Sequence, residues 1–304
     1  MPPFVASTDT LVRGIRISSP DRLIYPNIKF SKLDLVRYYD SVADLILPHV
    51  ADRPLTLVHC PDGLNSACNY MRHRRVWGPD VLRRVKIREK TKVGEYLAVD
   101  DAKGVIALAQ MGIVEIHTWN ATTGDVERPN RLVWDFDPGP EVGFEEVVKA
   151  ARAIRELLET LELRSWIKTT GGKGLHVVVP LTPHRHWDEC LDFARAVASA
   201  LAASDPALYT ITFAKRGREK KILIDYLRNN RTNTSVCAYS ARARAKATVS
   251  MPLTWKQLTA RLDPARYTVQ SVPGRKKPDP WKDYWTARQK ISDAAFDAIR
   301  RLAA

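Results

Sequence analysis

Two carboxylates stand at the end of a short apolar run. Residues 132–134 are typical of a strand, and Asp135 and Asp137 follow them. Pro138 and Gly139 must end this strand, because proline cannot continue a hydrogen-bonded ladder and glycine permits a turn. Residues i and i+2 of a strand share a face, so the two acids converge. The pair indicates a site for a divalent cation such as Mg²⁺ or Mn²⁺, although two acids in a solvated turn would have the same pattern.

A third carboxylate lies in a later apolar run. Residues 220–228 predict a strand that carries Asp225. An acid in such a run is costly to bury unless it faces a cation. Asp225 is therefore predicted to be the third metal ligand, and a salt bridge to Arg228 or Arg231 is the alternative.

A glycine-rich turn is predicted at residues 170–174, within a hairpin that spans residues 165–180. It is not a P-loop, because Gly-Lys-Gly leads here into a β-branched strand and not into a helix. Backbone amides in such a turn can still surround an anion. With Thr170, Lys173 and His176 alongside, we expect phosphate binding rather than a plain tight turn.

Two further features concern histidine and arginine. His117 lies near the end of an alternating strand at residues 113–119, where a structural hydrogen bond and a functional role are both open. Residues 241–247 alternate with period two, which predicts a strand with Arg242, Arg244 and Lys246 on one face. This face is expected to meet an anion, although a solvated edge strand would look the same.

Composition limits the class of protein. The 304 residues include 48 Lys plus Arg against 34 Asp plus Glu, a formal charge of +14, and 45% are hydrophobic. Such an excess suggests a polyanionic partner, with nucleic acid favoured over an anionic membrane surface. No run approaches the about 18 to 20 apolar residues of a spanning helix. The four cysteines include no Cys-x-x-Cys pair, so neither a zinc knuckle nor a disulfide framework is expected, and a reducing cytoplasm fits.

The remaining elements follow from periodicity and turn residues. From about Pro273 to Trp285 we expect a loop with few core residues. Helices are predicted at residues 32–47, 105–113, 144–161, 188–203 and 292–302, and further strands at 11–17, 55–60 and 96–99.

These motifs together resemble the archaeo-eukaryotic primase superfamily, and most closely the primase-polymerase domain of bacterial DNA ligase D. The resemblance runs from about Ser19 to Trp285. The matching segments are residues 115–119 (Glu-Ile-His-Thr-Trp), 134–138 (Trp-Asp-Phe-Asp-Pro), 170–176 (Thr-Gly-Gly-Lys-Gly-Leu-His) and 224–230 (Ile-Asp-Tyr-Leu-Arg-Asn-Asn).

The resemblance implies an α/β fold of the α+β kind, with a primase-like core whose mostly antiparallel sheet is flanked by helices. It implies a single primase-polymerase domain over residues 1–304. Within it, a smaller N-terminal portion that binds DNA ends covers about 1–110, the catalytic core about 111–290, and a C-terminal helix about 291–304.

The chemistry implied by the resemblance is nucleotidyl transfer to DNA 3′ ends at breaks and gaps during non-homologous end joining. The family commonly prefers ribonucleotides, ATP among them, and uses two divalent ions, Mn²⁺ or Mg²⁺. Asp135, Asp137 and Asp225 would hold these ions. The residues implied to grip the triphosphate are His117, Thr170, Lys173, His176 and Arg244.

DNA contacts and partners are implied as well. Lys32 matches a position that grips the 5′-phosphate of a recessed end, and Arg22 stands where a second is expected. Members of the family often carry two adjacent aromatics that stack on template bases. Only Tyr70 is present here, so stacking is expected to be weaker. Arg228 and Arg242 complete the implied DNA contacts. Implied partners are Ku and attached ligase and phosphoesterase domains, in the bacterial cytoplasm at the nucleoid, with no membrane.

Two other functions compete with polymerisation. A phosphohydrolase of the haloacid-dehalogenase type also begins at Asp-x-Asp, but it needs Gly-Thr after the nucleophile, where Pro138 and Gly139 stand here. A DNA-end-binding module with vestigial carboxylates would share the basic charge. Only turnover separates such a module from a polymerase.

Overall fold

The larger of two main sheets carries the acidic strands. The computed structural model describes residues 10–73, 80–274 and 279–303. Neighbouring strands are antiparallel, apart from the parallel pair at one edge. In spatial order they are β13 (Tyr209–Thr210), β14 (Ile222–Asp225), β10 (Arg131–Pro138), β12 (Leu175–Pro180), β11 (Trp166–Thr169) and β16 (Pro252–Leu253).

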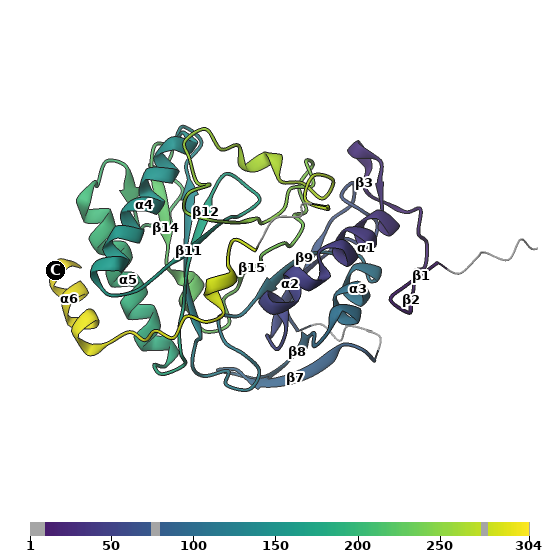
Figure 1. Cartoon of the computed structure of the whole chain (residues 1–304), viewed down its shortest axis with the longest axis horizontal. Coiled ribbons are helices and arrows are strands. Elements are labelled where there is room, and N and C mark those ends of the chain that lie inside the picture. The colour runs from purple at the N-terminus through teal and green to yellow at the C-terminus, as the bar shows by residue number, and fades with distance from the viewer. Residues whose placement is uncertain (1–9, 74–79, 275–278, 304) are drawn as a thin grey trace, which may run out of the picture.

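Helices cover this sheet on the side away from the N-terminal part of the chain (Figure 1). α4 (Phe144–Thr160) and α5 (Trp187–Ser204) contact β10 and its neighbours, and α6 (Asp293–Ala303) packs on α5. The amphipathic repeat of α4 explains its docking, because Val147 and Ile154 lie on one buried stripe while the opposite face is charged.

A smaller sheet lies beside the larger one, with helices α1 (Lys32–Ser41), α2 (Ala43–Val50) and α3 (Ala102–Gln110) packed next to it. α1 begins with a capping box, in which Ser31 Oγ accepts from Asp34 N and Asp34 Oδ2 accepts from Ser31 N. In spatial order the strands are β15 (Ser235–Val236), β9 (Ile113–Thr118), β5 (Leu55–His59) and β6 (Asn69–Met71).

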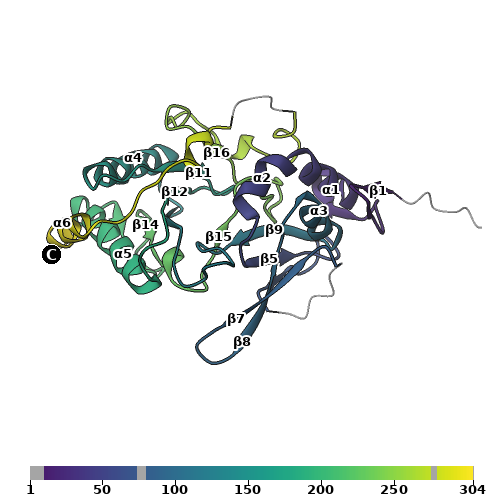
Figure 2. The same cartoon turned by 60° about the horizontal axis from the view of Figure 1, so that its bottom comes forward.

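Short hairpins complete the N-terminal part. The ribbon of β7 (Arg83–Arg88) and β8 (Val93–Ala98) projects from the body of the protein (Figure 2). The other pairs are β1 (Leu11–Val12) with β2 (Ile15–Arg16) and β3 (Leu23–Tyr25) with β4 (Phe30–Ser31); 3₁₀ turns lie at Pro26–Ile28, Leu227–Asn229, Pro264–Arg266 and Lys282–Tyr284.

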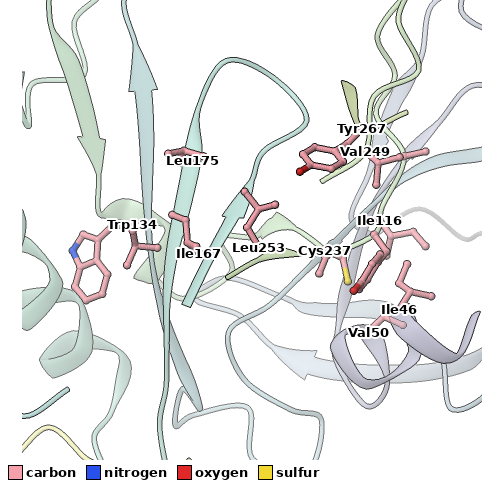
Figure 3. Packing of buried hydrophobic residues seen from close by; sticks show 14 of the residues in the cluster. Ile46, Val50, Ile116, Trp134, Ile167, Leu175, Cys237, Val249, Leu253 and Tyr267 are labelled. Atoms are coloured by element: carbon pink, nitrogen blue, oxygen red, sulfur yellow. The ribbon is translucent and has the colours of Figure 1, made fainter. Parts of the chain in front are cut away.

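One hydrophobic cluster joins both parts. It includes Trp134 of the larger sheet, Ile116 of the smaller sheet and Ile46 of α2, with Cys237 and Leu253 between them (Figure 3). Because close-packed interiors resist deformation, groups carried by the two sheets hold fixed positions relative to each other. The mixed α+β architecture with mostly antiparallel sheets confirms the predicted fold class.

Five local predictions were wrong. The strand expected over residues 11–17 is a hairpin of β1 and β2, because the chain turns at Arg13 and Gly14, which both have positive φ. The helix expected over residues 32–47 breaks at Val42, whose backbone leaves the helical region, and continues as α2. The strand expected over residues 241–247 is a turn-rich loop with an isolated bridge at Ala241. Ala247 has a positive φ, which an extended strand does not allow. The chain therefore turns here, although the alternation of residue types predicted a strand.

The expected absence of disulfides was also wrong, because Cys60 and Cys68 are bonded. Cys60 directly follows β5 and Cys68 directly precedes β6, in a hairpin where His59 pairs with Asn69. The next residues outward therefore face each other, with Cα atoms 4.4 Å apart. Motif spacing alone does not show this, since the pairing depends on strand register.

The segment near Trp285 contributes more to the core than expected. Trp281 and Tyr284 are buried and stack with ring centroids 5.0 Å apart. Tyr284 also meets Trp166 of β11 edge to face. The prediction of few core residues was wrong here, and residues 275–278 of that predicted loop lie outside the described part of the chain.

Candidate active site

A row of ionisable side chains crosses four strands of the larger sheet. Asp135 of β10 is opposite Asp225 of β14 on one side and His176 of β12 on the other. His176 is in turn opposite Lys168 of β11. Directly opposed residues of antiparallel strands share a face, so the register alone places these groups side by side.

Arg228 links the two opposed acids. Its Nη2 lies 3.0 Å from Asp135 Oδ2, and its Nε lies 3.0 Å from Asp225 Oδ2. His176 Nε2 lies 3.3 Å from the same oxygen of Asp135. Burial opposes ionisation of Asp135, but His176 and Arg228 together hold the pKa of Asp135 well below its usual range. Asp135 is therefore a carboxylate at neutral pH.

The pKa values of the other two acids, Asp137 and Asp225, are shifted upward. Burial and the negative charge of Asp135 raise the pKa of Asp137, although Arg218 Nη2 lies 3.1 Å from Asp137 Oδ2. Burial also raises the pKa of Asp225, against the opposing charge of Arg228. Burial is the larger cause of both raised pKa values and the neighbouring acids add to it; a divalent cation placed among the three acids would lower these pKa values.

The donor set fits a hard divalent cation. Carboxylate oxygens are the ligands that Mg²⁺ and Mn²⁺ prefer, and Asp135, Asp137 and Asp225 all border one cavity. As the side chains stand, no cluster of three or more acidic, histidine or cysteine ligands is arranged around a metal position within the described residues. Arg228 and Arg218 pair with the acids instead, so binding of a cation requires these guanidinium groups to withdraw.

The glycine-rich turn packs tightly over the acidic strand. A Cβ on Gly174 would lie 2.3 Å from the carbonyl oxygen of Phe136, and Gly171 has φ of +70°. Glycine is required at both positions for these reasons. Thr170 Oγ1 accepts from the amide of Gly172 at 3.2 Å, which fixes the bend. Lys173, at the tip, is exposed and makes no ion pair with any described residue.

The smaller sheet supplies the facing wall. Glu115 and His117 share a face of β9, and His117 Nε2 lies 2.8 Å from Glu115 Oε2. Arg242 Nε lies 3.1 Å from that same oxygen. Burial raises the pKa of Glu115, but His117 and Arg242 bring it down to about 2. Burial lowers the pKa of His117, so its imidazole is neutral at pH 7.

One cavity of about 270 Å³ brings the predicted residues together. Tyr70 borders it as well, with 70% of its surface exposed and its ring 5.9 Å from that of His117. The predicted residues that line this cavity are Tyr70, His117, Asp135, Asp137, Thr170, Lys173, His176, Asp225, Arg228, Arg242 and Arg244.

Two predicted DNA contacts do not line the cavity. Arg22 donates to the carbonyl of Pro61 at 2.6 Å, and Lys32 Nζ donates to Ser18 Oγ at 3.2 Å. Burial and the nearby charge of Arg22 lower the pKa of Lys32 to about 8.

Three site residues were missed by sequence reasoning. Glu115 had a usable signal, since it stands two residues before His117 in an alternating strand. Lys168 stood in the predicted hairpin, but only register shows that it joins the acidic row. Arg218 comes from a loop far along the chain, and nothing in the sequence connects it to Asp137.

Comparisons with known proteins agree with the resemblance that the sequence motifs indicated. The family model "LigD, primase-polymerase domain" matches residues 31–285. The multifunctional non-homologous end joining protein LigD of Pseudomonas aeruginosa is 38% identical over 288 residues, which cover 92% of this chain and 34% of the relative. Its counterpart from Mycolicibacterium smegmatis is 32% identical over 246 residues, 80% of this chain and 32% of the relative. The chain thus spans about a third of the length of these relatives.

A solved structure agrees with the sequence relatives. The polymerase domain from Mycobacterium tuberculosis ligase D, determined in complex with DNA, superposes with a TM-score of 0.80 at 30% identity. The match covers 86% of this chain and 93% of that one. Among the described residues, no helix is long and apolar enough to cross a membrane.

Proposed function

The chain belongs to the LigD primase-polymerase family, and from this premise we propose that it is a DNA-directed nucleotidyltransferase that extends 3′ ends at breaks and gaps. The observation that carries the proposal is the cavity between the two sheets. Acids from β10 and β14 and the glycine-rich turn before β12 border it together. Nucleotidyl transfer needs both cation ligands and a phosphate-binding surface at one place.

Asp135, Asp137 and Asp225 would hold two divalent ions, Mn²⁺ or Mg²⁺, once Arg228 and Arg218 withdraw. When bound, such ions lower the pKa of the attacking hydroxyl and neutralise charge on the leaving pyrophosphate. Asp135 suits this role because it stays ionised, while its opposed partner Asp225 is fixed by a 2.9 Å hydrogen bond from the amide of Leu227.

The triphosphate would lie against the glycine-rich turn. Lys173 supplies an exposed positive charge, and Thr170 fixes the bend. The guanidinium group of Arg244 lies beside Gly172, with Nη2 3.2 Å from the position that a Cβ of residue 172 would occupy. His117 and His176 face the same space. His176 has a pKa lowered to about 3, by burial first and by Lys168 second, so it acts as a neutral donor toward Asp135.

DNA would approach from the side of Tyr70, which is free to stack on a template base. Arg228 and Arg242 lie at the cavity and contribute positive charge to it. Arg22 and Lys32, which do not line the cavity, would bind the 5′-phosphate. They belong to an N-terminal portion of about residues 1–110, which is followed by the catalytic core at about 111–290 and the last helix at about 291–304. We extend the proposal to Ku, attached ligase and phosphoesterase domains and the nucleoid as the setting, in line with the end-joining names of the relatives.

Primer extension tests this function. The substrate is a gapped duplex with a 5′-phosphate at the downstream strand, supplied with Mn²⁺ or Mg²⁺ and either NTPs or dNTPs. We expect added nucleotides with release of pyrophosphate, and faster addition of NTPs than of dNTPs. Absence of extension in every combination, or release of inorganic phosphate in place of pyrophosphate, would contradict the proposal.

A further inference from the structure

Three basic side chains and a histidine are buried beside the acidic row, of which Lys168 is itself the last member. Arg53, Arg131 and Lys168 are 5%, 7% and 4% exposed, and His49 is 2% exposed. They come from separate parts of the chain: His49 lies on α2, Arg131 opens β10 and Lys168 lies on β11. Charges buried this deeply are normally paired with charges of the opposite sign.

Their partners here are neutral. Arg131 donates from Nε to Asn120 Oδ1 at 3.0 Å and from Nη2 to the carbonyl of Trp119 at 3.0 Å. Lys168 Nζ donates to Ser250 Oγ at 2.7 Å.

Arg53 Nη1 donates to Asn130 Oδ1 at 2.9 Å, and its Nε has no hydrogen-bond partner. Within residues 10–73, 80–274 and 279–303, none of these three cations forms an ion pair. Burial lowers the pKa of Lys168 to about 7 and that of Arg53 to about 9, so a negative charge nearby would favour the charged form of Lys168. The interior therefore carries positive charge, at Arg131, Arg53 and the charged form of Lys168, that the described side chains do not balance.

A small cavity lies among these groups. Its volume is about 10 Å³, enough for one small occupant, and its polar lining includes His49, Arg131, Lys168 and Cys237. The Nε2 atom of His49 is buried and has no hydrogen-bond partner in the described structure. An unpartnered imidazole nitrogen at a cavity wall indicates an occupant that forms a hydrogen bond with it, as the acceptor when Nε2 carries the proton.

The protein's own groups do not supply the missing negative charge. Burial raises the pKa of the Cys237 thiol to about 11, so it is not a thiolate at neutral pH. Asp135 lies beyond His176 in the row and is already paired with Arg228. A neutral water would accept from His49 but would leave the charge of Arg131 unbalanced.

We propose that this cavity binds one small monovalent inorganic anion of the chloride class, which accepts from His49 Nε2–H and balances the charges of Arg131 and Lys168. This cavity is distinct from the active-site cavity, although Ser235 and Val236 border both, and the proposal does not depend on the function proposed above. An anion here would stabilise the packing of α2 against β10 and β11, because its ligands come from all three elements.

Bromide provides the direct test, since it replaces chloride and scatters anomalously. Crystals of the wild-type chain grown in sodium bromide are expected to show an anomalous peak within hydrogen-bond distance of His49 Nε2. Lys168→Met should lose this peak, whereas Lys149→Met, on the exposed face of α4, should keep it. A cavity without anomalous signal would overturn the proposal and mean that Lys168 stays uncharged with water beside it.

Thermal unfolding gives an independent measurement in solution. Sodium chloride, compared with sodium gluconate at equal ionic strength, should raise the Tm of wild type by roughly 2 to 4 °C when chloride is about tenfold above its dissociation constant. His49→Phe removes the donor without removing charge, and it keeps the test decisive if Lys168→Met does not fold. An equal chloride effect in wild type and His49→Phe would contradict the site.

Discussion

The active-site cavity, proposed to bind the nucleotide, and the N-terminal pair of Arg22 and Lys32 use positive charge in different ways. In the cavity, Arg228 and Arg242 lie about 3 Å from buried acids, at 3.0 and 3.1 Å. In the N-terminal pair, Lys32 donates to a serine hydroxyl, and Arg22 is 3.9 Å from exposed Asp62. Closely paired charges hold one another in place, whereas Arg22 has only a long ion pair and Lys32, which is 4% exposed, has only a hydroxyl partner. Changes to the paired acids of the cavity should therefore alter turnover, whereas changes in the N-terminal pair should alter DNA affinity alone.

The largest effect is expected from the acidic row. Asp135→Asn keeps the shape of the side chain but removes the charge that a divalent cation needs, so the extension rate should fall by at least about 100-fold. Steady-state primer extension with Mn²⁺ measures it. Asp297→Asn, exposed on α6, is the matched control and should extend like wild type. An Asp135→Asn rate within a few-fold of wild type would remove the cavity from the chemistry.

A smaller effect is expected at the glycine-rich turn. Lys173→Ala removes the charged donor that is proposed to bind the triphosphate, so KM for the nucleotide should rise roughly 10- to 100-fold. Lys149→Ala on α4 is the control. If KM for the nucleotide is unchanged and only DNA affinity falls, Lys173 contacts the primer or template and not the triphosphate.

The next smaller effect is expected from Tyr70, which is proposed to stack on one template base. Tyr70→Ala should weaken binding of a template overhang by roughly fivefold, the lower end of the range for aromatic stacking, because one aromatic stands here. Fluorescence anisotropy with labelled overhangs measures it. Tyr70→Phe keeps the ring and should bind like wild type; a loss as large as that of Tyr70→Ala would mean that the hydroxyl, not the ring, makes the contact.

The smallest effect is expected at the N-terminal pair, and it depends on pH. Lys32 has a pKa of about 8, and a phosphate favours its charged form. Affinity for a 5′-phosphorylated end should therefore fall as pH rises through about 8. Lys32→Ala should lose that fall and reduce the slope of log K against log salt by about 0.9, while Lys256→Ala should change neither. Identical pH profiles for wild type and Lys32→Ala would show that the pair does not bind the phosphate.

The sequence predicted the residues of the candidate site better than it predicted the strand pairings and contacts that position them. The shared face of Asp135 and Asp137 follows from strand periodicity, and the need for a cation near Asp225 follows from burial. The placement of Asp225 opposite Asp135 follows from neither, because it depends on the register of strands that are far apart in the chain. The pairing of Cys60 with Cys68 was missed because it depends on the register of the local hairpin between β5 and β6, and the salt bridge from Arg218 to Asp137 was missed because Arg218 lies in a distant loop.

The alternating arginines show the reverse case. Arg242 and Arg244 do border the cavity, although the strand that was expected to present them does not form. Their charge, and not their predicted conformation, was the useful signal. Backbone turns at residues such as Ala247 are set by contacts with distant segments, so local alternation does not determine them.

The location of bound Mn²⁺ tests the central claim most directly. Anomalous diffraction from crystals grown with Mn²⁺ and a nucleoside triphosphate should place manganese on the carboxylates of Asp135, Asp137 and Asp225, with Arg228 and Arg218 turned away. Manganese bound elsewhere, with both arginines still paired to these acids, would contradict the account.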